Sequence, residues 1–350
     1  MEISFVKTEN KEGCPYFQVR EESGLTINFD YFLETEELWQ GLSLDTFEFL
    51  LLENPFYNAE SNVFELKMDE IDERLGFLIP INALLSNDGN FNKILCNYAF
   101  GAFWYLLSKI KKLREYSNNL SDYFRETLIV CVLHKRTIQR QIPTFTFDSY
   151  LLSFYEKGYS VYTKEPVKLV KGYDYEILIS NSRTLHLKKV TNNTINDPFF
   201  KDLFIKYLPK EETALARFII VYQAIEYLMS EICNTEIEQI IKDFSEKRIN
   251  KNDYFDQVGQ LGGERKQIRL IFERINSNSK HLTNFERECN FLYAQINYSP
   301  QRNNTADLFY SFRNLVVHNY RDLLDFESQV ISTIQKFELL VIHICKTITY

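Results

Sequence analysis

Late in the chain, one stretch reads Arg313-Asn314-Leu315-Val316-Val317-His318, and it lies inside a longer, mainly apolar segment at 305–324. Apolar side chains in this segment recur at the i, i+3, i+4 and i+7 spacing of one buried helical face. They are Leu308, Phe309, Phe312, Leu315 and Val316. At about 100° per residue, the opposite face carries Arg313, Asn314, Val317, His318 and Arg321. The segment therefore predicts a packed helix that presents a cation, an amide and an imidazole on one side.

These side chains suit chemistry on a phosphodiester. Arg313 can hold phosphate oxygens in a charge-assisted fork, and His318 can transfer a proton near neutral pH. Asn314 is the i, i+4 neighbour of His318 and can fix the imidazole or donate to the phosphate. Arg321 is a further cation that we expect to support the site. The alternative is a solvated helix face with no catalytic role.

The segment resembles the HEPN superfamily, whose all-helical members carry Arg, four to six residues and then His, often with Asn after the Arg. Here Arg313, Asn314 and His318 match that pattern. The resemblance covers the C-terminal part of the chain and implies an endoribonuclease with these three catalytic residues, without metal or cofactor. In such enzymes the 2′-hydroxyl attacks the adjacent phosphate and leaves a 2′,3′-cyclic phosphate and a 5′-hydroxyl end. Because the reaction needs both an acid and a base, the resemblance also implies a homodimer with a composite site.

The plan of a strand-rich half before such a module resembles ribonucleases of bacterial antiphage, abortive-infection systems. That resemblance implies a dormant enzyme that cuts RNA, with tRNA as one candidate, after infection is detected. The N-terminal half would then sense a phage-derived trigger or bind a regulatory partner.

Two further groups of residues are candidates for supporting roles. Glu226 follows Tyr222 by one turn on a predicted helix at 214–233, and we expect it to orient Arg313 or another active-site base, as an acidic residue does in some HEPN proteins. A partly exposed glutamate without such a role is the alternative. A predicted helix at 264–276 carries a basic strip that can contact RNA, although a solvated face is the commoner explanation for such a strip. The strip consists of Arg265, Lys266 and Arg269.

Composition limits the class of protein. The chain has 350 residues and a net charge of −8, which argues against nucleic-acid binding over the whole surface but permits a local basic site. Its 6 Cys are scattered without metal-ligand spacing, which predicts reduced thiols and no metal site. Residues 1–7 show no signal-peptide pattern, and the purest apolar run, 128–133, is too short to span a bilayer. We therefore expect a cytoplasmic protein that does not contact membranes.

The coarse pattern predicts an α+β protein with two domains: a mixed, strand-rich domain at 1–195 and an all-α, HEPN-like bundle at 196–350. Strands are expected at 3–7, 16–20, 25–29 and 63–68, with an antiparallel meander at 167–190. The run at 127–133 fits either a buried strand or a helix. One helix is expected at 92–116. The predicted bundle helices lie at 214–233, 235–247, 264–276, 283–295, 306–324 and 326–348.

Two other interpretations of the sequence are alternatives to a ribonuclease. Many HEPN-like bundles are non-catalytic dimerisation or interaction modules, in which Arg313 and His318 would serve packing between chains. The element Glu65-Leu66-Lys67, with Asp45 upstream, is typical of metal-dependent restriction nucleases but is only a short match.

Overall fold

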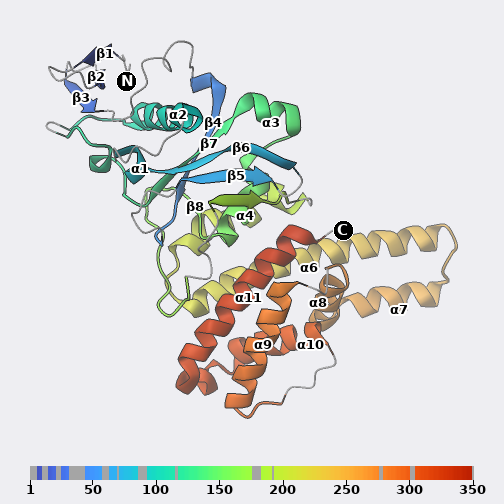
Figure 1. Cartoon of the computed structure of the whole chain (residues 1–350). Coiled ribbons are helices and arrows are strands. Elements are labelled where there is room, and N and C mark those ends of the chain that lie inside the picture. Colours follow the sequence, from blue (N-terminus) through green and yellow to red (C-terminus); the bar gives the residue numbers. More distant parts are fainter. Residues whose placement is uncertain are drawn as a thin grey trace. The chain divides into compact units, whose positions relative to one another are not determined.

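The chain folds into two compact units in the computed structural model (Figure 1). The structure describes residues 6–9, 15–20, 25–30, 44–56, 63–68, 71–85, 93–114, 117–175, 183–190, 193–275, 279–299 and 304–348. The first unit contains Met1–Phe147, Lys157–Val167 and Leu178–Lys188, and the second contains Asp148–Glu156, Lys168–Ile177 and Lys189–Tyr350. The sequence predicted one boundary near residue 195, whereas the chain passes between the units several times before Lys189. The first unit is mixed and strand-rich and the second is helical, so the predicted α+β class is confirmed.

The described strands of the first unit form two sheets. The smaller is an antiparallel meander of β1 (Val6–Glu9), β2 (Pro15–Arg20) and β3 (Thr26–Asp30). The larger has the order β8-β4-β7-β6-β5-β9. Its strands are β4 (Phe47–Glu53), β5 (Phe64–Met68), β6 (Ile71–Pro80), β7 (Leu128–His134), β8 (Ser160–Val161) and β9 (Thr184–Leu187).

The ambiguous run at 127–133 is the strand β7, which pairs antiparallel with β4 and β6 on its two sides. Every residue from Leu128 to Leu133 is buried, and such burial on both faces explains the continuous apolar run. Val130 and Val132 belong to a core that also contains Ala99 and Phe103 of α2 (Lys93–Lys109). The predicted helix at 92–116 is therefore present but ends earlier.

The predicted meander at 167–190 is wrong in its pairing. Among the described residues, β9 pairs in parallel with β5, which is about 115 residues earlier in the chain. Residues 167–170 form no strand, because Lys168 already belongs to the helical unit and donates its backbone N–H to the carbonyl oxygen of Pro209 at 2.8 Å. Residues 176–182 of the expected meander and residues 3–5 of the first expected strand lie outside the described residues.

The helical unit is built around six longer helices among its described residues: α6 (Ala214–Ser245), α7 (Lys251–Leu261), α8 (Glu264–Glu273), α9 (Lys280–Gln295), α10 (Thr305–His318) and α11 (Glu327–Thr347). Shorter elements are α4 (Leu151–Glu156), α5 (Pro198–Asp202) and the 3₁₀ segment η8 (Tyr320–Phe326). The sequence predicted a break near residue 234, but α6 continues through it, because Asn234 and Thr235 are only weak helix breakers. The hydroxyl of Thr235 donates to the carbonyl oxygen of Glu231, one turn earlier in the same helix, at 3.0 Å. The helix α7 was not predicted. The helix predicted at 306–324 ends at His318 and is followed by η8.

An aromatic cluster forms the centre of this bundle. Phe337 of α11 lies 4.7 Å from Phe218 of α6 and 4.8 Å from Phe309 of α10, measured between ring centroids. Phe285 of α9 and Phe312 of α10 complete the cluster, and all five side chains are almost fully buried. Helices α6, α9, α10 and α11 are thus held around one core, and this packing fixes the orientation of α10.

A buried ion pair ties the earlier segments of the chain to the same bundle. Arg217 of α6 forms a bidentate ion pair with Glu338 of α11: Nε donates to Oε2 at 3.0 Å, and Nη2 donates to Oε1. Both side chains are 8% exposed. The hydroxyls of Tyr155 and Tyr173 donate to the two oxygens of Glu338, each at 3.1 Å. These bonds explain why 148–156 and 168–175 fold with the helical unit.

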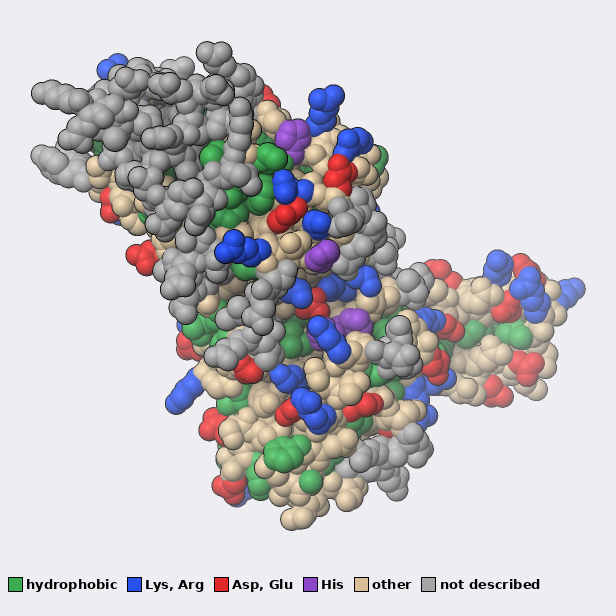
Figure 2. All heavy atoms as spheres, in the orientation of Figure 1, with side chains coloured by type: hydrophobic (Ala, Val, Ile, Leu, Met, Phe, Trp, Pro, Cys, Tyr) green, Lys and Arg blue, Asp and Glu red, His purple; other side chains and the backbone are tan. Residues whose placement is uncertain are grey.

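The surface of the helical unit carries charges of both signs. On the face drawn in Figure 2, basic and acidic side chains are interspersed along the projecting α6–α7 hairpin, without one large basic patch. Among the helices of the described part of the chain, none combines the length and the apolar character needed to cross a membrane.

Candidate active site

The helix α10 presents the Arg-Asn-His motif as the sequence predicts. Its start is capped by Asn304, whose side-chain oxygen accepts from the backbone N–H of Asp307 at 2.9 Å. The predicted apolar stripe is buried in full: Leu308, Phe309, Phe312, Leu315 and Val316. Arg313 and Asn314 are half-buried on the other side, and His318 is exposed at the last residue of the helix.

Arg313, Asn314 and His318 meet at one point. Nη1 of Arg313 donates to Oδ1 of Asn314 at 3.0 Å and lies 3.1 Å from Nε2 of His318. Because a guanidinium only donates, Nε2 is the accepting nitrogen in this contact, which requires the tautomer with the proton on Nδ1. The nitrogen that can take up a proton therefore lies beside the cation.

Two residues from other helices hold the guanidinium in place. Nε of Arg313 lies 3.2 Å from Oε1 of Glu264, the first residue of α8, in an ion pair without hydrogen-bond alignment. The hydroxyl of Tyr222 on α6 donates to the same carboxylate oxygen at 2.6 Å, and its ring lies under the guanidinium with 5.4 Å to the centroid. Burial and this hydrogen bond to Glu264 raise the pKa of Tyr222 well above its usual range, so the phenol stays a donor.

The remaining groups of Arg313 are available to an anion. Its side chain is 18% exposed, and Nη2 hydrogen-bonds to none of the described residues. The exposed imidazole of His318 lies on the same side. A phosphate oxygen bound to Nη2 would therefore lie close to a base, and the cation would already be oriented before binding.

The expected contact between Glu226 and Arg313 is absent among the described residues. Glu226 is exposed on α6, and the carboxylate that contacts Arg313 belongs to Glu264. Glu226 and Tyr222 do share one side of α6, since Glu226 contributes to the raised pKa of Tyr222. No sequence pattern linked Glu264 to Arg313, because the two lie on separate helices and meet only through tertiary packing.

The basic strip on α8 has an internal partner. Nε of Arg265 lies 2.8 Å and Nη2 of Arg269 2.9 Å from Oδ1 of Asp307, a fully buried carboxylate on α10. The two arginines therefore neutralise Asp307 and join α8 to α10, while their side chains remain 42% and 36% exposed, so contact with RNA stays a prediction. Lys266 is half-buried and forms no ion pair with any described residue. Arg321 is exposed in η8, just beyond the motif helix.

Within the described residues, no group of three or more His, Cys, Asp or Glu side chains is arranged to hold a metal ion. Glu65 of the restriction-like element forms an ion pair with Arg74, with 2.9 Å from Oε1 to Nε.

Comparisons with known proteins found no match: no family model, no curated protein and no solved structure is similar to this chain.

Proposed function

We propose that the chain is a metal-independent endoribonuclease of the HEPN type, with Arg313, Asn314 and His318 as catalytic residues. The observation that carries the proposal is the cluster in which a preoriented guanidinium lies 3.1 Å from the accepting nitrogen of an exposed imidazole. His318 would remove the proton from the 2′-hydroxyl or return one to the leaving 5′-oxygen. Arg313 would stabilise the charge that builds on the non-bridging phosphate oxygens.

The biological setting belongs to the same proposal. The strand-rich unit before the helical one supports a regulated ribonuclease of antiphage defence, acting on RNA in the cytoplasm. A phage-derived trigger or a regulatory protein would then act through the N-terminal unit.

The experiment that tests this function compares an RNA strand with a DNA strand of the same sequence in the presence of EDTA. We expect the RNA to be cut and the DNA to stay intact, because DNA lacks the 2′-hydroxyl nucleophile. DNA cleavage that depends on added magnesium would support the restriction-type reading instead and would contradict the proposal.

Glu264 is expected to act as the positioning residue for Arg313. The change Glu264→Gln removes the ionic partner of the guanidinium but keeps the shape of the side chain. We expect RNA cleavage to fall about 10- to 100-fold, because a misplaced catalytic group has an effect of that size. Glu226→Gln, on an exposed glutamate of the same region, is the matched control and should change kcat/KM little. A larger loss in the control would return the role to Glu226.

A two-fold dimer is expected to bring a second His318 to the site. Val317, the neighbour of His318, is apolar and 46% exposed, so a second copy can cover it. In Val317→Glu, two negative charges would face each other across the two-fold axis, which would make the free energy of dimerisation less favourable by several kcal/mol. We expect this variant to be a monomer and inactive on RNA. Light scattering should give the mass of two 41.7-kDa chains for the native protein and of one for the variant.

The control for Val317→Glu is Phe255→Glu, a charge placed on another exposed apolar residue, in α7. It should leave both the dimer and the activity unchanged. A native protein that is monomeric and still cuts RNA would contradict the composite site.

A further inference from the structure

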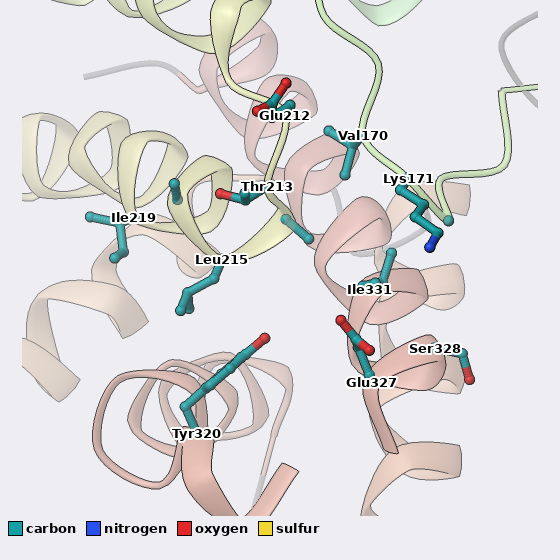
Figure 3. A pocket seen from close by; sticks show the side chains of 13 residues that line it. Val170, Lys171, Glu212, Thr213, Leu215, Ile219, Tyr320, Glu327, Ser328 and Ile331 are labelled. Carbon is teal, nitrogen blue, oxygen red and sulfur yellow. The ribbon is translucent and has the colours of Figure 1, made fainter. Parts of the chain in front are cut away.

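A pocket of about 730 Å³ opens in the helical unit (Figure 3). It is formed by the first turns of α6, the first turns of α11, the segment 170–172 and Tyr320 of η8. Its volume lies within the range of small-molecule sites, roughly 300 to 1,000 Å³. No catalytic residue proposed above lines it.

The walls of the pocket are apolar and aromatic. Leu215, Ile331 and the ring of Tyr320 flank the open space in Figure 3. Gly172 has φ +89°, and a Cβ there would lie 3.3 Å from Cγ2 of Ile331, so a glycine lets the chain pass close to this wall. A flat aromatic ring between aliphatic side chains and a phenol is the type of ligand that such walls accommodate.

Two carboxylates line the pocket, and only one of them is paired. Glu212 forms an ion pair with Lys168, with 3.1 Å from Oε2 to Nζ. Glu327 is exposed and forms no ion pair with the described residues. Burial, and after it the negative charge of Glu327, raises the pKa of Tyr320. The carboxylate of Glu327 therefore lies near the phenol of Tyr320. Lys171, also exposed, lines the pocket as a cation. The pocket thus offers one acceptor pair and one cation.

Two residues that line the pocket are close in the chain to residues of the candidate active site. Ile219 lines the pocket and lies three residues before Tyr222, about 4.5 Å along the axis of α6, on a neighbouring face. Tyr222 is the residue whose ring lies under Arg313. Tyr320, which also lines the pocket, follows His318 by two residues. A nucleotide in the pocket would therefore lie next to the phosphate that Arg313 can bind.

We propose that this pocket binds a guanine base of the RNA strand, next to the phosphate held by Arg313, an inference that rests on the proposed function. Glu327 would accept from the two adjacent donors of guanine, its ring N–H and its exocyclic amino group, because a carboxylate offers only acceptors. Adenine, cytosine and uracil place an acceptor beside their donor on that edge, so each fits the carboxylate less well. Lys171 would contact a phosphate, which adds affinity but no choice of base.

The test is calorimetric titration of the full chain with the 3′-monophosphates of guanosine, adenosine, cytidine and uridine. We expect the guanosine nucleotide to bind at least about tenfold more tightly than the others. Glu327→Gln should abolish this preference, whereas Lys171→Ala should weaken binding of all four nucleotides alike. Leu215→Trp, which fills the space, should prevent binding, and the exposed Asp325→Asn should change nothing.

The outcomes separate this proposal from the function on which it rests, because binding can be measured in His318→Ala. RNA cleavage together with equal binding of the four nucleotides, or with none, would overturn the guanine pocket and leave the ribonuclease in place. A guanine preference that survives Glu327→Gln would also overturn it. Guanine-specific binding by a protein that cuts no RNA would overturn the proposed function and the assignment of the base to an RNA substrate.

Discussion

His318→Ala is expected to lower the rate of RNA cleavage by about 10²- to 10⁴-fold, the contribution of one well-placed general acid or base. The variant removes the only imidazole of the motif while leaving the buried face of α10 untouched. Because His318 is exposed at the end of α10, the fold should not change. Single-turnover cleavage rates at saturating enzyme measure the chemical step directly.

The matched control for this variant is His186→Ala, which removes an exposed histidine from the strand-rich unit. It should cut RNA at the native rate. Cleavage that survives His318→Ala unchanged would place the chemistry elsewhere in the chain, and equal losses in both variants would point to a general effect on the protein.

Glu338→Ala is expected to lower the free energy of unfolding by about 3 to 5 kcal/mol, because it leaves Arg217 as a buried charge without its partner. The change also removes the acceptor for the hydroxyls of Tyr155 and Tyr173. Urea unfolding followed by circular dichroism gives the midpoint and the slope from which this loss is calculated.

A double variant separates the ion pair from the packing around it. In Arg217→Met with Glu338→Leu, both charges are replaced by apolar side chains of similar volume, and we expect most of the lost stability to return. If the single variant unfolds at the native urea concentration, the pair is not the structural link described here. If the double variant is as unstable as the single one, the tyrosine hydrogen bonds carry the stability instead.

The spacing of apolar residues predicted those elements whose structure depends on neighbours in the sequence. The stripe from Leu308 to Val316 gave α10 and its buried face, because the helical period alone decides which side chains point inward. The pairing of β9 with β5 was not predictable, because a parallel partner is distant in sequence and leaves no turn signal. The continuous α6 was missed because Asn234 and Thr235 resemble a break when only propensity is considered.

In the candidate site, the sequence likewise predicted the contacts within one helix but not the contacts between helices. The cluster of Arg313, Asn314 and His318 lies within one helix, so its spacing sufficed to predict it. Glu264 was missed because its contact with Arg313 depends on how α8 packs against α10, which no pattern in the sequence encodes. The pairing of Arg265 and Arg269 with Asp307 was missed for the same reason, since a buried aspartate at the start of α10 has the same sequence pattern as a solvated one.

The proposed ribonuclease is tested most directly by the chemistry of the ends produced when the native protein cuts total cellular RNA in EDTA, with a phage lysate added as trigger in a parallel reaction. We expect discrete fragments with 2′,3′-cyclic phosphate and 5′-hydroxyl ends, and we expect these fragments to be lost in Arg313→Ala and His318→Ala variants that keep the native mass in solution. Fragments with 3′-hydroxyl and 5′-phosphate ends, or no fragments under either condition, would contradict it.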